Sequence, residues 1–241
     1  MPMTDQLGLV LFGDVVGSRR DNVGSTTWLR ELVAQLDDAY ASSRLAPFGF
    51  TQGDELQGLL IPSADPIVAV LLAALGPERK HVRWVAARGR VDIDPGAGAA
   101  PATERTGDAF VAAREAIAAA RTGRDRLVIV TGQPDVDELL ADLCPALSDL
   151  LEGLTARQRL VARLALIDDL RQSEVADRLH VRRATISVSF TRARVRPLQR
   201  LVAGIRRVYA SSSGDPWRAS IRGETDLGGV DVGGTAGSPT M

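Results

Sequence analysis

The stretch LGLVLFGDVV, residues 7–16, is a run of apolar residues with one carboxylate near its end. Leu, Val and Phe fill consecutive positions, so both faces of an extended chain are apolar there, which is typical of a strand buried inside a sheet. We therefore predict a central strand that ends near Asp14. The segments that follow it decide what kind of sheet it belongs to.

Helical and extended patterns alternate after this strand. Apolar residues recur at helical spacing from Thr26 to Tyr40, and Gly53-Asp54 suits the tip of a hairpin. Further elements are predicted as two short strands within 48–61, a helix ending at Leu75, a strand at 82–93, a helix from 107, a strand at 126–132 and a helix at 135–151. The order β-α-β-β-α-β-α-β favours an α+β fold with a ferredoxin-like βαββαβ sheet and one added element.

The net charge of −1 hides a strong asymmetry. Residues 1–153 carry 14 basic and 22 acidic groups, residues 154–210 carry 13 and 4, and residues 211–241 carry 2 and 4. A basic segment of this density favours a polyanion as its partner. The alternative is that the acidic and basic parts simply dock on each other.

Composition also limits where the protein acts and what it can bind. The longest uninterrupted apolar run, residues 67–75, is too short to span a bilayer, and the N-terminus lacks a signal-peptide pattern, so we expect a cytoplasmic protein with no membrane partner. With one cysteine, Cys144, and two histidines, His81 and His180, the chain has no disulfide framework and no Cys- or His-rich metal site.

Carboxylates are therefore the expected ligands of any metal ion. Asp14 and Asp54 come from strands that are neighbours in the predicted sheet, and oxygen ligands suit Mg²⁺ or Mn²⁺, the cations used in nucleotidyl transfer. Glu55 is expected on the opposite face of its strand from Asp54. The alternative is that Asp14 caps a turn and Gly53-Asp54 only forms one.

Three stretches, VLFGDVVGS (10–18), FTQGDELQGLL (50–60) and RTGDAFVAAREAI (105–117), resemble the signatures of SatD-like bacterial proteins. The N-terminal part of that family is similar to the class III nucleotide cyclase domain, a palm-type fold. The resemblance covers roughly residues 7–132. It implies that Asp14 and Asp54 are metal ligands and that Arg114 contacts a bound ligand.

This chain departs from the cyclase pattern at several places. Val111 stands where cyclases have an asparagine, Arg114 is one residue out of step, and Lys80 is the only lysine. These departures favour a domain that senses a nucleotide or a metal, or an inert scaffold, with no catalytic residues assigned. The alternative is a divergent Mg- or Mn-dependent nucleotidyl cyclase.

The basic segment has the pattern of a helix-turn-helix that begins at Gln172. Apolar residues occur where such a unit needs them, Ala176 lies where the two helices cross, and His180 occupies the turn. A preceding helix, residues 155–170, starts with a Thr cap and completes the core. The segment resembles region four of sigma factors and the LuxR-type regulators, which implies binding to double-stranded DNA.

The second helix of such a unit enters the major groove. We expect Arg182, Arg183, Thr185 and Ser187 to lie at bases or flanking phosphates, and Arg192, Arg194, Arg196 and Arg200 to contact phosphates. The alternative is a three-helix protein-interaction module with a solvated arginine face.

The predicted organisation has four parts. They are a cyclase-like ferredoxin-fold domain at 1–134, a linking helix at 135–153, an all-α helix-turn-helix domain at 154–210 and a disordered tail at 211–241. Together they predict a transcriptional regulator that binds DNA, with a nucleotide as a candidate ligand and a homodimer as a candidate assembly. An adaptor that contacts RNA polymerase is a further alternative.

Overall fold

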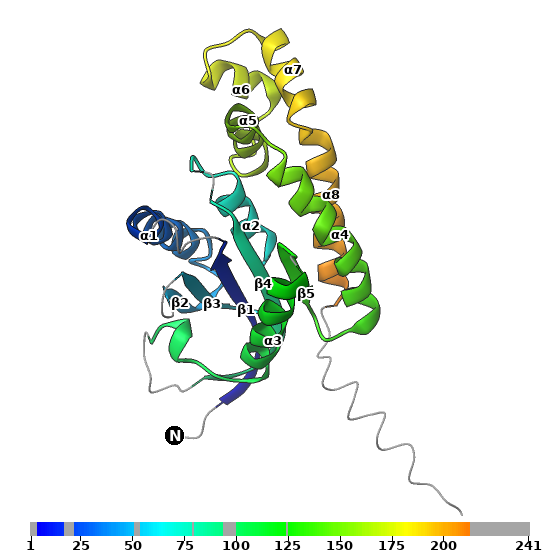
Figure 1. Cartoon of the computed structure of the whole chain (residues 1–241). Helices are drawn as coiled ribbons and strands as arrows, with labels where there is room; N and C mark the ends of the chain where they lie inside the picture. The colour runs from blue at the N-terminus through cyan, green and yellow to red at the C-terminus, as the bar shows by residue number, and fades with distance from the viewer. Residues whose placement is uncertain are drawn as a thin grey trace, which may run out of the picture.

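The computed structural model describes residues 4–16, 22–50, 54–78, 80–93, 100–123 and 125–212. A five-stranded sheet carries helices on both faces, and a group of helices extends beyond one end of it (Figure 1). This arrangement confirms the α+β class. The predicted tail lies outside the described residues except for its first two positions.

The elements alternate as the sequence pattern predicts. The strands are β1 (Thr4–Val15), β2 (Arg44–Phe50), β3 (Glu55–Leu60), β4 (Val82–Ile93) and β5 (Leu127–Val130). The helices are α1 (Asn22–Ala39), α2 (Ile67–Ala74), η2 (Ala102–Glu104), α3 (Asp108–Gly123), α4 (Pro134–Glu152), α5 (Ala156–Leu166), α6 (Gln172–Arg178), α7 (Arg183–Arg192) and α8 (Val195–Ser211).

The strands are arranged in the order β2-β3-β1-β4-β5. β1 pairs antiparallel with both β3 and β4, and β3 pairs antiparallel with β2, so β1 and β2 run parallel with β3 between them. β5 lies at the edge and runs parallel to β4. The central position of β1 explains why its sequence is apolar on both faces.

Alternate residues of β1 enter two different cores. Leu9 and Leu11 belong to the larger core, which also contains side chains of α1 and α2. Val10 and Phe12 belong to a smaller core under α3. Successive side chains of a strand point to opposite faces, so Asp14 shares its face with Val10 and Phe12.

The larger core continues from the sheet into the helices at its end. Leu140 and Leu147 of α4 lie in the same cluster as Val202 and Ile205 of α8, and the two helices lie side by side (Figure 1). A residue in the left-handed region, Arg194 with φ 51°, separates α7 from α8. The sequence pattern predicts neither this break nor the return of α8 toward the sheet.

The start of α5 is capped as predicted. The Thr155 hydroxyl accepts a hydrogen bond from the Gln158 backbone N–H, and the Gln158 side chain accepts one from the Thr155 N–H. This reciprocal pair satisfies two backbone donors that the helix leaves unpaired.

Among the helices within the described ranges, none combines the length and apolarity that crossing a bilayer requires.

Two glycines give a matched test of backbone packing. A Cβ at Gly107 would lie 2.6 Å from the Arg90 carbonyl oxygen, at a φ of +129° that L-residues rarely adopt. A Cβ at Gly204 in α8 would meet nothing within 4 Å. We expect Gly107→Ala to lower the free energy of unfolding by about 1–3 kcal/mol and Gly204→Ala to raise it by about 0.5–1 kcal/mol. Urea denaturation measures both changes in the free energy of unfolding. A negligible loss of stability in Gly107→Ala would contradict the close approach of Gly107 to Arg90.

Candidate functional site

Asp14 lies between two charged residues of the neighbouring strands. The β-sheet register pairs it with Glu55 of β3 and with Arg83 of β4. Directly opposite residues in an antiparallel pair share a face, so all three side chains lie on the side of the sheet that α3 covers. A carboxylate pair and an arginine therefore meet at this end of the sheet.

Two arginines hold the Asp14 carboxylate. The Nη1 atom of Arg83 donates to its Oδ2 atom at 2.6 Å, and Arg121, from the last turn of α3, donates to both carboxylate oxygens at 3.0 and 3.2 Å. Arg121 also pairs with Glu55. Asp14 is 7% exposed and Arg83 8%, whereas the side chain of Arg121 is 44% exposed. The ion pair between Asp14 and Arg83 is thus a buried one.

The partners of Arg121 also fix its charge. Hydrogen bonds to Asp14 and then to Glu55 raise the pKa of the Arg121 guanidinium, which stays a cation at every accessible pH. Arg83 is anchored from a second side, because its Nε atom donates to the Asp125 carbonyl oxygen at 3.0 Å. Arg83 is therefore a fixed member of the cluster, and Arg121 is the member that solvent can reach.

Asp54 lies just before β3 and is not the residue that pairs with Asp14. β3 begins one residue after Asp54, so the register sets Glu55, and not Asp54, opposite Asp14. The Asp54 carbonyl oxygen accepts a hydrogen bond from the Val15 N–H at 3.2 Å. Arg114 is exposed on α3, and Arg121 lies seven residues later on the same face of that helix.

Arg83 and Arg121 are residues that the sequence alone does not assign. Arg83 stands in a strand whose alternation places it opposite the Asp14 position, and Arg121 follows the predicted Arg114 by two helical turns. Neither arginine can be assigned to the neighbourhood of Asp14 until the strand register is known. The cluster of Asp14, Glu55, Arg83 and Arg121 is called the carboxylate–arginine cluster below.

In this conformation the oxygens of Asp14 are engaged by guanidinium groups. A divalent cation at Asp14 would face two positive charges at hydrogen-bond distance, so it requires Arg121 to move away. In the part of the chain that the structure describes, no group of three or more His, Cys, Asp or Glu side chains could hold a metal ion. A site for Mg²⁺ or Mn²⁺ at Asp14 and Asp54 therefore stays a prediction. Whether the cation can bind depends on whether Arg121 leaves the Asp14 carboxylate.

Removing the arginine should strengthen metal binding. We expect Arg121→Gln to bind Mn²⁺ about tenfold more tightly than the wild-type chain, because the loss of one like charge near the carboxylates favours the cation. The spin-resonance signal of free Mn²⁺ measures the affinity. Arg114→Gln, which removes an exposed charge from the same helix, serves as the control. Equal affinities for the two variants would argue against a metal ion at Asp14.

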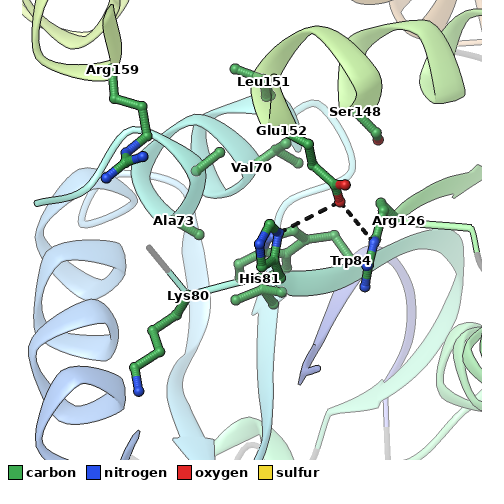
Figure 2. A pocket seen from close by; sticks show the side chains of 12 residues that line it. Val70, Ala73, Lys80, His81, Trp84, Arg126, Ser148, Leu151, Glu152 and Arg159 are labelled. Carbon is green, nitrogen blue, oxygen red and sulfur yellow. Dashed lines mark ion pairs between the residues drawn. The ribbon is translucent and has the colours of Figure 1, made fainter. Parts of the chain in front are cut away.

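A second feature lies where the sheet meets the helices at its end. Glu152, the last residue of α4, pairs with Arg126 at 2.8 Å and with His81 at 3.6 Å beside a cavity of about 50 Å³ (Figure 2). Arg159 of α5 lines the same cavity. Small-molecule sites usually occupy about 300–1,000 Å³, so this cavity is too small for such a ligand. It is a gap at the place where the sheet and the helices meet.

Two short helices, α6 and α7, stand at the far end of the molecule (Figure 1). Val175 and Ile186 are fully buried between them, and Ala176 is 1% exposed at their crossing, in agreement with the predicted core. His180 adopts a φ of 51° in the connecting turn, the conformation for which glycine is the usual residue. The backbone of His180 is therefore strained, because this residue carries a side chain.

All eight residues predicted to contact DNA are exposed, including Arg196 and Arg200 of α8. The other six are considered together. They are Arg182, Arg183, Thr185, Ser187, Arg192 and Arg194, at the start of α7, along it and just after it. Within the described ranges, no carboxylate forms an ion pair with any of these four arginines. Together these six residues form what is called the α7 basic face below.

Comparisons with known proteins give little further information. No protein-family model matches the chain, and no curated protein matches it. Among solved structures, it is similar to a bacterial light-regulated adenylyl cyclase, at 13% identity and a TM-score of 0.39 over 54% of this chain. The match spans 44% of that cyclase chain. A regulator of polyketide synthase expression from Bifidobacterium adolescentis is similar at 16% identity and a TM-score of 0.25, over 87% of this chain and 80% of that one.

Proposed function

We propose that the chain is a transcriptional regulator that binds double-stranded DNA through a helix-turn-helix formed by α6 and α7. The observation that carries this proposal is the α7 basic face, an exposed set of arginine and hydroxyl side chains along and beside a helix that stands away from the sheet. Arginines in this position can form bidentate bonds to guanine or contact phosphates. Solvent exposure without ion-pair partners leaves these side chains available for such bonds.

The sheet is proposed to be a ferredoxin-like, palm-type domain related to class III cyclases and SatD-like proteins. The strand order β2-β3-β1-β4 supports this, because it contains a split β-α-β unit with β3 between two parallel strands. In this proposal the domain senses a nucleotide or a metal ion and does not catalyse cyclisation. The engagement of Asp14 by Arg83 and Arg121 supports a degenerate site.

Selection of duplexes from a random pool by the full-length chain tests the proposal directly. We expect enrichment of a defined motif, and a two-fold repeat spaced by one helical turn if the chain acts as a homodimer. Failure to enrich any duplex would overturn the proposal. Release of pyrophosphate from ATP or GTP with Mn²⁺, abolished by Asp14→Asn, would instead identify a nucleotidyl cyclase.

A further inference from the structure

A cavity of about 340 Å³ lies between the sheet and the C-terminal end of α8. Its walls come from three separate parts of the chain: Leu7 of β1 and Arg88 of β4, the loop before α2, and the last turns of α8. This volume falls within the range of small-molecule sites. Leu7 and Arg88 lie on the opposite face of the sheet from Asp14 and Arg83, because Arg88 pairs with Leu9 whereas Arg83 pairs with Asp14, so the cavity is separate from the carboxylate–arginine cluster.

The side chain of Arg88 supplies the chemical character of this cavity. Arg88 is 6% exposed, and its Nη1 atom donates to the Ser212 carbonyl oxygen at 2.5 Å and to the Ser212 hydroxyl at 2.6 Å. Its Cζ atom lies 4.2 Å from the centroid of the Tyr209 ring. All these partners are neutral, and the Nε atom has no hydrogen-bond partner among the described residues.

The charge of Arg88 is therefore left without a carboxylate in the described part of the chain. The other two charged residues of the cavity neutralise each other, since Arg206 and Asp65 form an ion pair at 2.7 Å. One positive charge remains, on a group that is almost completely removed from water. A buried charge without a counter-ion is costly, so the cavity favours an anion.

Apart from Ser63 on the rim, the remaining walls are apolar or aromatic. Leu7 and Pro62 line the cavity together with the Tyr209 ring, whose hydroxyl is already used in a hydrogen bond to the Pro62 carbonyl oxygen at 2.9 Å. An inorganic anion would leave these surfaces in contact with water. A molecule that joins an apolar body to one negative group would cover them and reach the guanidinium together.

We propose that this cavity, called the Arg88 cavity below, binds a small organic acid with one carboxylate. The carboxylate lies at the guanidinium of Arg88, and the apolar body lies against Leu7, Pro62 and the ring of Tyr209. The site joins two parts of the molecule, because the sheet supplies Arg88 and Leu7 whereas α8 supplies Tyr209 and Arg206. A bound acid strengthens the attachment of α8 to the sheet.

Hexanoate and hexanamide form a matched pair of probes that differ in charge and share an apolar chain. We expect ligand-detected NMR to show that the full-length chain binds hexanoate at least about tenfold more tightly than hexanamide or inorganic phosphate. Equal binding of the acid and the amide would overturn the assignment of the charge. Phosphate binding as tightly as hexanoate would overturn the assignment of an organic acid.

Three variants locate the probe. Arg88→Met removes the cation, and Ser63→Trp, at an exposed position on the rim, fills the cavity while Arg88 stays in place. Both should weaken hexanoate binding at least about tenfold. Arg207 is an exposed arginine of α8 that does not line the cavity, so Arg207→Gln should leave hexanoate binding unchanged. If Arg88→Met does not fold, Ser63→Trp decides alone, and unchanged binding in that variant would refute the site.

A regulatory consequence rests on the proposed function. α8 begins one residue after Arg194 of the α7 basic face, so an acid that ties the far end of α8 to the sheet restrains the helices that contact DNA. We expect saturating hexanoate to change the dissociation constant for a selected duplex in the wild-type chain and not in Ser63→Trp. If no duplex binds at all, the proposed function fails, whereas the NMR titration still judges the cavity.

Discussion

An Arg183→Ala variant is expected to bind a selected duplex at least about tenfold more weakly than the wild-type chain, with relaxed preference at one or two base pairs. Arg183 is the first residue of α7 and is exposed. The N-terminal residues of a recognition helix lie at base edges, where one good bidentate contact discriminates by about 1–3 kcal/mol. Fluorescence anisotropy with labelled duplexes measures the change.

Loss of Arg192 or Arg194 should have a different signature. Both residues lie toward the end of the α7 basic face, where phosphate contacts are expected. Each lost phosphate contact should weaken binding for all sequences alike and reduce the slope of log affinity against log salt by about 1. The measurement is a titration at several salt concentrations between low and physiological values.

The control for these variants is Arg207→Ala. Arg207 is an exposed arginine near the C-terminal end of α8, at the opposite end of that helix from α7. Its replacement removes the same charge and should leave affinity and salt slope nearly unchanged. Affinity that is insensitive to salt in the wild-type chain, or equal losses at Arg183 and Arg207, would argue against the α7 basic face as the DNA contact.

The second large effect concerns the stability of the sheet. We expect Asp14→Ala to lower the free energy of unfolding by about 3–5 kcal/mol, the usual cost of removing one partner from a buried ion pair. The alanine leaves Arg83, 8% exposed, without its carboxylate, and it releases Arg121 on the surface. Most of the cost therefore arises at Arg83, because Arg121 can turn into solvent.

A double variant separates this cost from a loss of packing. Asp14→Leu with Arg83→Met replaces the buried pair by apolar groups, and it should recover most of the stability that Asp14→Ala loses. Asp38→Ala, an exposed carboxylate on α1, should stay within about 0.5 kcal/mol of the wild-type chain. Urea denaturation gives all four values. A loss at Asp14 no larger than that at Asp38 would contradict the pairing.

Local patterns predicted many elements closely. The strand predicted at 82–93 matches β4, the predicted Thr cap opens α5, and Ala176, the residue assigned to the crossing of the two helices, is buried. These features depend on side-chain periodicity and on bonds between residues a few positions apart, which a single sequence carries directly. In α7 the apolar residues Ile186 and Phe190, about one helical turn apart, are buried, whereas Arg183, Thr185 and Ser187 are exposed.

The partners of Asp14 could not be predicted in this way. The sequence indicates an acidic pair of Asp14 and Asp54, but the register sets Glu55 opposite Asp14. A shift of one residue in register exchanges the faces of every side chain in a strand. Arg121 reaches the cluster only because α3 crosses that face of the sheet and ends there.

By itself the sequence determined a half in which helices and strands alternate, a basic helical half, and many of the residues that the helices and strands turn inward, because these depend on short-range periodicity and charge. Only the tertiary structure decided that arginines neutralise Asp14, that α8 returns along α4, and that Arg88 lies buried beside a cavity. The hydrogen bond between Arg83 and Asp14 joins residues 69 positions apart, and the one between Arg88 and Ser212 joins residues 124 positions apart. Contacts at such separations are set by how whole elements pack, and no local pattern encodes them.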